Sequence, residues 1–221
     1  MPSPLGHALA SAILHKWKVP GKWTSDWRTL LFHVFCGICP DLDFIPGLLT
    51  GNINQFHHTL SHSFPGAFLI AGILWLFYAV WKKTWKMSDY LFILILVIIH
   101  PIMDVLAVDT SYAYGCPLLY PFTKEYWISP WVFFQDIHRR SLYEFFLGGN
   151  NRLAFWIEFV VFLPLIVVAT FFSMKKVWGI GALISFMIAL YYLRSTIISE
   201  SEIKFSGVFT PYTVSETRSA K

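Results

Sequence analysis

The amino-acid sequence predicts an all-α fold: a polytopic membrane helical bundle with about four transmembrane helices and short N-terminal buried or interfacial helices. Of its 221 residues, 56% are hydrophobic and only 14% are charged, whereas soluble domains average about 45–50% and about 25%. Aromatic residues make up 19% of the chain, an abundance typical of proteins that fill a bilayer and its interfaces. We therefore interpret residues 1–198 as one membrane-embedded domain and residues 199–221 as a polar C-terminal tail.

Several apolar stretches are long enough to cross the hydrocarbon core, which takes about 20 helical residues. The expected spans are residues 64–81, 90–108, 153–174 and 177–193. Residues 29–39 form an apolar stretch that is too short to span, and we expect a helix buried against the others or lying at the interface. Residues 1–18 are expected to form a weakly amphipathic helix of the same kind.

Two linkers between these spans are very short, and they determine the expected topology. Lys82–Asp89 and Lys175–Lys176 cannot recross the bilayer, so each predicts an antiparallel hairpin with its turn on the same side. The N-terminal segment, the loop 109–152 and the tail then share the opposite side. Basic residues near the span ends are balanced between the two sides, so the sequence leaves the orientation in the membrane open.

The charge and cysteine content exclude some function classes. The net charge is +4 without any long basic run, so we expect membrane lipids and no nucleic acid as partners. Cys36 and Cys39 form a CxxC pair, but Cys116 is the only further cysteine. A four-cysteine zinc site is therefore excluded, and we interpret all three as buried small apolar residues.

His100 and Asp104 are the most informative polar residues because they lie inside a predicted span. A charged side chain there costs about 3 kcal/mol or more, so such residues are functional candidates. The HxxxD spacing places both on one helical face, where they could ligate the same cation. A buried His–Asp hydrogen bond that only holds the helix in place explains this pair equally well.

Two further sets of polar residues precede the first predicted span in the chain. Asp41 and Asp43 lie in CPDLD, where we expect Pro40 to end the preceding helix. The segment FHHTLSHS contributes His57, His58 and His62. Either His58 and His62, at i and i+4, or His57 and His62, five residues apart, could bind a metal ion.

The predicted topology brings these groups to one depth. The histidines before the first span and Asp104 each lie about 20 residues, or about 30 Å of helix, from the Lys82 turn. His7 can join them from the N-terminal helix. Imidazole and carboxylate ligands without thiolate suit a divalent metal, most naturally zinc and alternatively manganese, in one to three ions. We favour this metal centre over a purely structural polar network.

At these residues the chain resembles the YdjM-like membrane-bound metal-dependent hydrolases. The similar elements are GHALAS, PDLD, HHTLSHS and HPIMDVLAVDTSYAYGCPLLYPF, and together they cover residues 5–130. The last two predicted spans carry none of the family's motifs. His58 stands where the family shows an arginine, and only one HxxxD is present.

The resemblance implies a hydrolase distantly similar to zinc-dependent phospholipases C and single-strand nucleases. It implies that Asp43 is a catalytic base or a ligand, and that His58 occupies a position facing substrate. The implied metal ligands are His7, Asp41, His57, His62, His100 and Asp104.

The leading hypothesis is a metal-dependent hydrolase that uses activated water on a phosphoester of a lipid or lipid-linked substrate. Lys124 is a candidate for holding the anionic head group, whereas Arg139 and Arg140 are better explained as interfacial anchors. Ser61 or Ser63 as a nucleophile is a weak alternative, because neither has a recognisable acid–base partner beyond the metal ligands. Two rival functions stay open: a transporter with an intramembrane His–Asp relay for ions or protons, and a non-catalytic scaffold with a structural metal.

Overall fold

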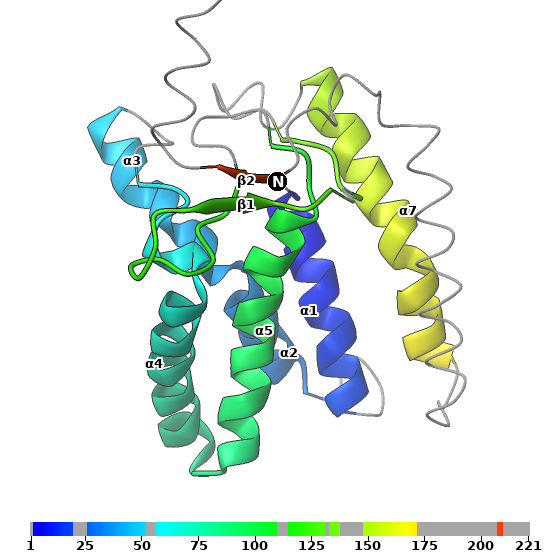
Figure 1. Cartoon of the computed structure of the whole chain (residues 1–221). Helices are drawn as coiled ribbons and strands as arrows, with labels where there is room; N and C mark the ends of the chain where they lie inside the picture. The colour runs from blue at the N-terminus through cyan, green and yellow to red at the C-terminus, as the bar shows by residue number, and fades with distance from the viewer. Residues whose placement is uncertain are drawn as a thin grey trace, which may run out of the picture.

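A computed structural model describes residues 2–19, 26–51, 56–109, 115–130, 133–137, 148–171 and 207–209. Within these residues the protein is a bundle of α-helices with one two-stranded sheet, which confirms the predicted all-α class (Figure 1). The expected span 177–193, the turn at Lys175–Lys176 and the basic pair Arg139 and Arg140 lie outside the described residues.

Helices α1 (Pro4–Lys18) and α2 (Trp27–Ile38) form an antiparallel pair. Ser3 caps α1 by accepting hydrogen bonds from the backbone N–H groups of Leu5 and Gly6. The two helices approach closely at Gly37, where an added Cβ would lie 1.8 Å from Ser11 Oγ. Any larger residue at this crossing would force the Ser11 side chain to move.

The chain continues from α2 through the 3-10 helix η1 (Cys39–Asp43) into α3 (Phe44–Thr50). As expected, α2 ends just before Pro40, at Ile38. Pro40 lies in the first turn of η1, where its missing N–H has no intrahelical acceptor to lose, and the chain continues as a 3-10 helix. The expectation that this segment is too short to span is wrong, because Trp27–Gly47 is a 21-residue segment long and apolar enough to cross a membrane.

Helices α4 (Phe64–Lys82) and α5 (Met87–Val105) form the predicted hairpin, and each is long and apolar enough to span. Ser63 caps α4 by accepting from the Gly66 N–H. Lys83 ends α4 in the left-handed conformation, with φ 52°. The α4–α5 turn lies at one end of the bundle, and the N-terminus, α3 and the sheet lie at the other (Figure 1). This confirms the expected separation between the Lys82–Asp89 turn and the N-terminal segment.

The sheet is a feature that the sequence did not predict. Strand β1 (Tyr126–Ile128) pairs antiparallel with β2 (Gly207–Phe209), so part of the tail packs against the loop that follows α5. The 3-10 helix η2 (Leu60–His62) precedes α4, and the Phe64 N–H donates to the Leu118 carbonyl at 2.9 Å. These contacts tie the loop to the start of α4.

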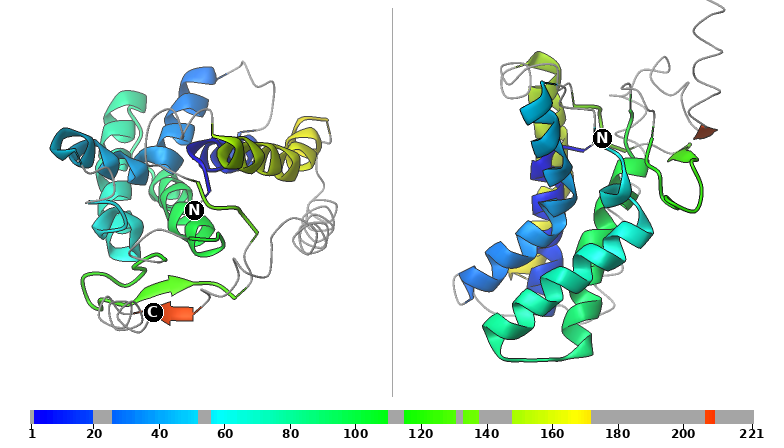
Figure 2. Two further views of the ribbon diagram at one scale, coloured as in Figure 1. Left: turned by 90° about the horizontal axis from the view of Figure 1, so that it is seen from above. Right: turned by 90° about the vertical axis from the view of Figure 1, so that its left-hand side faces the viewer.

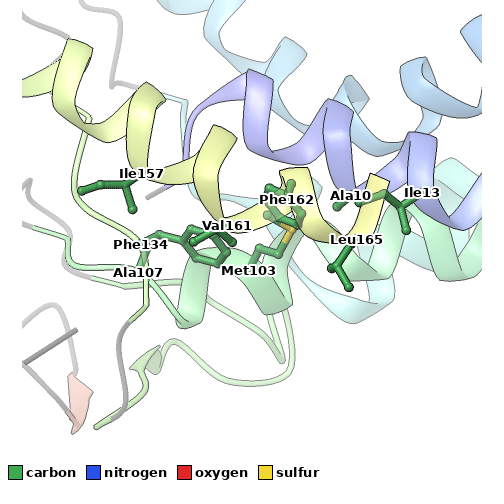
Figure 3. Packing of buried hydrophobic residues seen from close by; sticks show 9 residues of the cluster. All are labelled: Ala10, Ile13, Met103, Ala107, Phe134, Ile157, Val161, Phe162 and Leu165. Carbon is green, nitrogen blue, oxygen red and sulfur yellow. The ribbon is translucent and has the colours of Figure 1, made fainter. Parts of the chain in front are cut away.

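Helix α7 (Gly149–Phe171) corresponds to the expected span 153–174 and packs beside α1, as the view from above shows (Figure 2). Its apolar face, α1 and the end of α5 enclose one buried hydrophobic cluster (Figure 3). The cluster consists of Ala10, Ile13, Met103, Ala107, Phe134, Ile157, Val161, Phe162 and Leu165. Glu158 is also buried, and its carboxylate accepts hydrogen bonds from the Ser3 N–H and hydroxyl at the start of α1.

Candidate metal centre

Four separate elements bring histidine and aspartate side chains together at the end of the bundle opposite the α4–α5 turn. Helix α1, η1, η2 and α5 each contribute at least one of them. All are buried, and together they form what we call the ligand cluster: His7, Asp41, His62, His100 and Asp104.

The centre of the ligand cluster is a set of four side chains. His100 Nε2 lies 3.1 Å from His62 Nε2, 3.4 Å from Asp41 Oδ1 and 3.4 Å from Asp104 Oδ2. His62 Nε2 lies 3.6 Å from each of the same two carboxylate oxygens.

These separations match the edges of a tetrahedral coordination shell. Ligand bonds of about 2.0–2.1 Å to zinc place neighbouring ligand atoms about 3.3–3.4 Å apart. The five measured distances, from 3.1 to 3.6 Å, scatter around that value. The described side chains therefore fit a divalent cation.

The orientation of the His100 ring is fixed by a backbone group. Its Nδ1–H donates to the Gly37 carbonyl at 2.7 Å, which leaves a lone pair on Nε2 at the centre of the cluster. Such a hydrogen bond behind the ring is typical of metal-binding histidines. The close approach of α1 and α2 at Gly37 thus also serves to position His100.

His7 extends the ligand cluster toward α1. Its ring stacks on His100 with centroids 3.7 Å apart, and its Nε2 lies 3.4 Å from Asp104 Oδ1. One ligand atom each from His7, Asp41 and His100 lies within 4.8 Å of the others, as does one each from His62, His100 and Asp104. His100 therefore belongs to both groups.

The polar atoms of His7 and Asp104 also favour cation binding. Among the described residues, neither ring nitrogen of His7 and neither carboxylate oxygen of Asp104 has a hydrogen-bond partner, although all are buried. Buried polar atoms of this kind are costly unless they are paired or coordinate a metal. Burial lowers the pKa of His7, so its ring is neutral at pH 7, the form that binds metals.

His62 has the opposite electrostatic environment. Although burial lowers its pKa, hydrogen bonds to Asp41 and Asp43 raise it to about 10. Its Nδ1 faces Asp43 Oδ2 at 3.1 Å and Ser61 Oγ at 3.0 Å. In the absence of a metal ion, a proton on His62 supplies the positive charge that the surrounding carboxylates require, and a divalent cation can take its place.

Asp43 lies beside the ligand cluster, where it is half-buried and joins several polar groups. It accepts a hydrogen bond from Ser61 Oγ at 2.6 Å and lies 2.7 Å from His57 Nδ1. The His57 ring is also stacked on Phe44, with centroids 3.9 Å apart. Of the histidines in FHHTLSHS, His62 thus lies in the four-membered set, while His57 pairs with Asp43.

His58 and Lys124, the candidates for substrate binding, lie in different surroundings. His58 is buried, and its backbone has the left-handed conformation (φ 56°). Its ring stacks on His57, and its Nδ1 lies 3.7 Å from Asp109 Oδ2. Lys124 is exposed in the segment that leads into β1. One ligand atom each from His57, His58 and His62 lies within 4.8 Å of the others, so a further cation position among these three is geometrically open.

Two residues near the cluster were missed by the sequence analysis. Asp109 is buried, faces His58 and accepts the Gly115 N–H at 2.8 Å. Its position five residues after Asp104, just past the span, was a signal that could have identified it. Gly37 had no such signal, because its role depends on the crossing with α1 and on the His100 contact.

Comparison with known protein families places the chain beside a family of membrane proteins. A family model described as YdjM inner membrane protein matches residues 4–178, a range that includes every member of the ligand cluster. None of the curated proteins compared with the chain matches it, and neither does any of the solved structures.

Proposed function

The chain belongs to the YdjM inner membrane protein family, and we propose that it is a membrane-embedded, metal-dependent hydrolase of phosphoesters carried by lipids or lipid-linked molecules. The observation that carries this proposal is the four-membered set of His62, His100, Asp41 and Asp104. Its ligand atoms are spaced as in a tetrahedral shell, inside a bundle where uncompensated charge is expensive.

A zinc ion held by three members of this set, with water in the fourth position, would supply a Lewis acid and would lower the pKa of that water to about 7. Asp43 is the residue best placed to take a proton next to the cluster. His57 holds one of its oxygens at 2.7 Å and Ser61 the other at 2.6 Å, so the carboxylate is fixed in orientation. Its side chain is 10% exposed, so it is largely but not fully enclosed.

Apolar surface around the cluster supports a substrate with acyl chains. Large exposed apolar side chains flank the site residues in η1, α3, η2 and the loop after α5. They include Leu42, Ile45, Leu49, Leu60, Leu119 and Phe122. Exposed apolar patches rimmed by polar groups mark membrane or ligand contact. Lys124, exposed in the same loop region, is the proposed contact for an anionic head group.

We also propose that the protein crosses the membrane several times, since Trp27–Gly47, Phe64–Lys82 and Met87–Val105 each have the required length and apolarity. Cysteines introduced at Trp85 and Tyr120 should then react with impermeant probes from opposite sides. The native cysteines Cys36, Cys39 and Cys116 are buried and should give little background. Labelling of both positions from the same side would contradict this topology.

The hydrolase proposal is tested by combining metal analysis with an activity screen on the purified protein. We expect bound zinc or manganese, and hydrolysis of a fluorescent phosphodiester lipid that a chelator abolishes and added metal restores. A water-soluble phosphodiester serves as the control, and it should be cleaved less well than the lipid. Stoichiometric metal without turnover of any phosphoester would instead support the structural scaffold, and protein that binds no metal would contradict both.

A further inference from the structure

A second pair of buried histidines lies in the bundle away from the ligand cluster. His15 of α1 and His33 of α2 are 4% and 3% exposed, and their Nδ1 atoms lie 2.8 Å apart. At that distance one Nδ1 donates and the other accepts, so at least one ring is neutral. Neither ring contacts a member of the ligand cluster in any interaction that the structure shows.

This pair lies on a polar stripe that runs along the α1–α2 contact. His7, Ser11 and His15 follow one another at i, i+4 and i+8 on α1, and all three are buried. The stripe covers about 12 Å of helix axis, starting at the ligand cluster. On α2 the same register places buried Thr29, His33 and Gly37 along the opposing face.

The stripe also contains two buried hydroxyl groups at positions where apolar side chains would cost less free energy to bury. Ser11 and Thr29 are buried, and among the described residues neither hydroxyl has a hydrogen-bond partner. Such groups are expensive inside a membrane bundle unless they serve a purpose.

Charged residues surround the end of the stripe that lies farther from the ligand cluster. Lys18 Nζ lies 2.9 Å from Asp89 Oδ1 and above the ring of Phe92, which in turn packs edge-on against His33. Lys82 and Asp26 form a second ion pair, with 3.4 Å between Nζ and Oδ2. Lys16 is the remaining cation on this part of α1, and it is largely buried. The stripe thus connects the ligand cluster with a water-exposed charged rim near the α4–α5 turn.

We propose that Ser11 and the His15–His33 pair carry protons between the ligand cluster and the Lys18–Asp89 end of the bundle. A neutral imidazole and a hydroxyl can each accept a proton on one side while releasing another on the opposite side, so every group ends a transfer with the protons it had at the start. Single bridging waters would close the gaps between successive groups. This inference goes beyond hydrolysis and does not depend on it.

The test measures proton flux through the purified full-length protein in liposomes. The vesicles contain a pH-sensitive dye, and a potassium gradient with valinomycin drives protons inward; no phosphoester is present. Wild-type protein should conduct protons above the level of protein-free vesicles. Ser11→Ala, which removes one hydroxyl, and His33→Gln, which keeps polarity without a titratable ring, should bring the flux down to that level.

Two further measurements keep the result interpretable. Metal content should be unchanged in Ser11→Ala, because this residue is one turn away from His7 and contributes no ligand. Cys36→Ala removes a buried side chain of α2 that packs in the apolar cluster with Ala67 and Leu96, and it should conduct like the wild type.

Wild-type flux no greater than that of protein-free vesicles overturns the proposal, as does equal flux in wild type and Ser11→Ala. A hydrolase that fails its own assay leaves this measurement unaffected.

Discussion

Met103 and Asp104 are consecutive residues of α5, both nearly inaccessible at 5% and 2% exposure, yet they belong to opposite kinds of interior. Met103 packs with Phe134 and Phe162 in the apolar cluster between α1, α5 and α7 (Figure 3). Asp104 faces His62 and His100 with oxygens that no described group satisfies. The apolar side is complete by packing alone, whereas the polar side has the geometry to hold a cation. The two regions should therefore respond to different perturbations.

Alanine substitution of Met103 and of Asp104 should give the largest difference in behaviour between the two regions. Asp104→Ala should abolish both bound metal and turnover, because it removes the carboxylate that faces His7 with one oxygen and His62 and His100 with the other. Met103→Ala should cost about 2–5 kcal/mol of stability through the cavity it leaves, but folded protein should keep its metal. Elemental analysis and thermal unfolding measure the two effects. Full activity in Asp104→Ala would remove the hydrolase proposal.

The next effect concerns Asp43, which lies beside the ligand cluster. Asp43→Asn should lower turnover by about 10²–10⁴-fold, the usual contribution of a general base, while most of the metal stays bound. The amide keeps the shape that contacts His57 and Ser61 but accepts protons poorly. The measurement is kcat together with metal content. Loss of metal as complete as in Asp104→Ala would make Asp43 a ligand.

A smaller effect is expected when the close contact between α1 and α2 is disturbed. Gly37→Ala should destabilise the protein by about 1–3 kcal/mol, because its Cβ would overlap Ser11 and displace the carbonyl that orients His100. Gly72→Ala on α4 is the matched control, since nothing lies within 4 Å of its added Cβ. It should be neutral or stabilising by up to about 1 kcal/mol, because alanine is the better helix former. Equal stability changes in the two variants would contradict the importance of the crossing.

The smallest effect should come from Lys124, which is exposed. Lys124→Ala should raise KM for an anionic lipid substrate by a few-fold at most, since exposed ion pairs contribute about 0.2–1 kcal/mol. Neither kcat nor metal content should change. Lys124→Arg keeps the charge and should restore KM. An unchanged KM in Lys124→Ala would remove this residue from the proposed substrate site.

The two regions also differ in how well the sequence predicts them. Apolar runs such as Phe64–Lys82 are visible from length and composition, and the confirmed hairpin placed His62 and Asp104 at the same end of the bundle. The distances within the cluster were not predictable from the sequence. Which histidine of FHHTLSHS joins the cluster depends on the left-handed backbone of His58 and on the 3-10 helix η2.

The end of α2 before Pro40 was predicted, but the helical segments η1 and α3 that follow it directly were not. A proline after an apolar run marks the end of a helix, and no local signal shows that a 3-10 helix continues beyond it. The strand pair β1–β2 was missed for a related reason. Each strand is only 3 residues long, and the pairing joins segments that are far apart in the chain.

His100 belongs to both groups of ligand atoms, and this shared membership determines how the site tolerates change. Losing His7 leaves His62, His100 and Asp104 in place, whereas losing His62 removes a member of the four-membered set. Losing His100 breaks both groups at once. The cluster should therefore tolerate change at its edge on α1 better than at its centre, so natural variation should accumulate at His7 before it reaches His62 or His100.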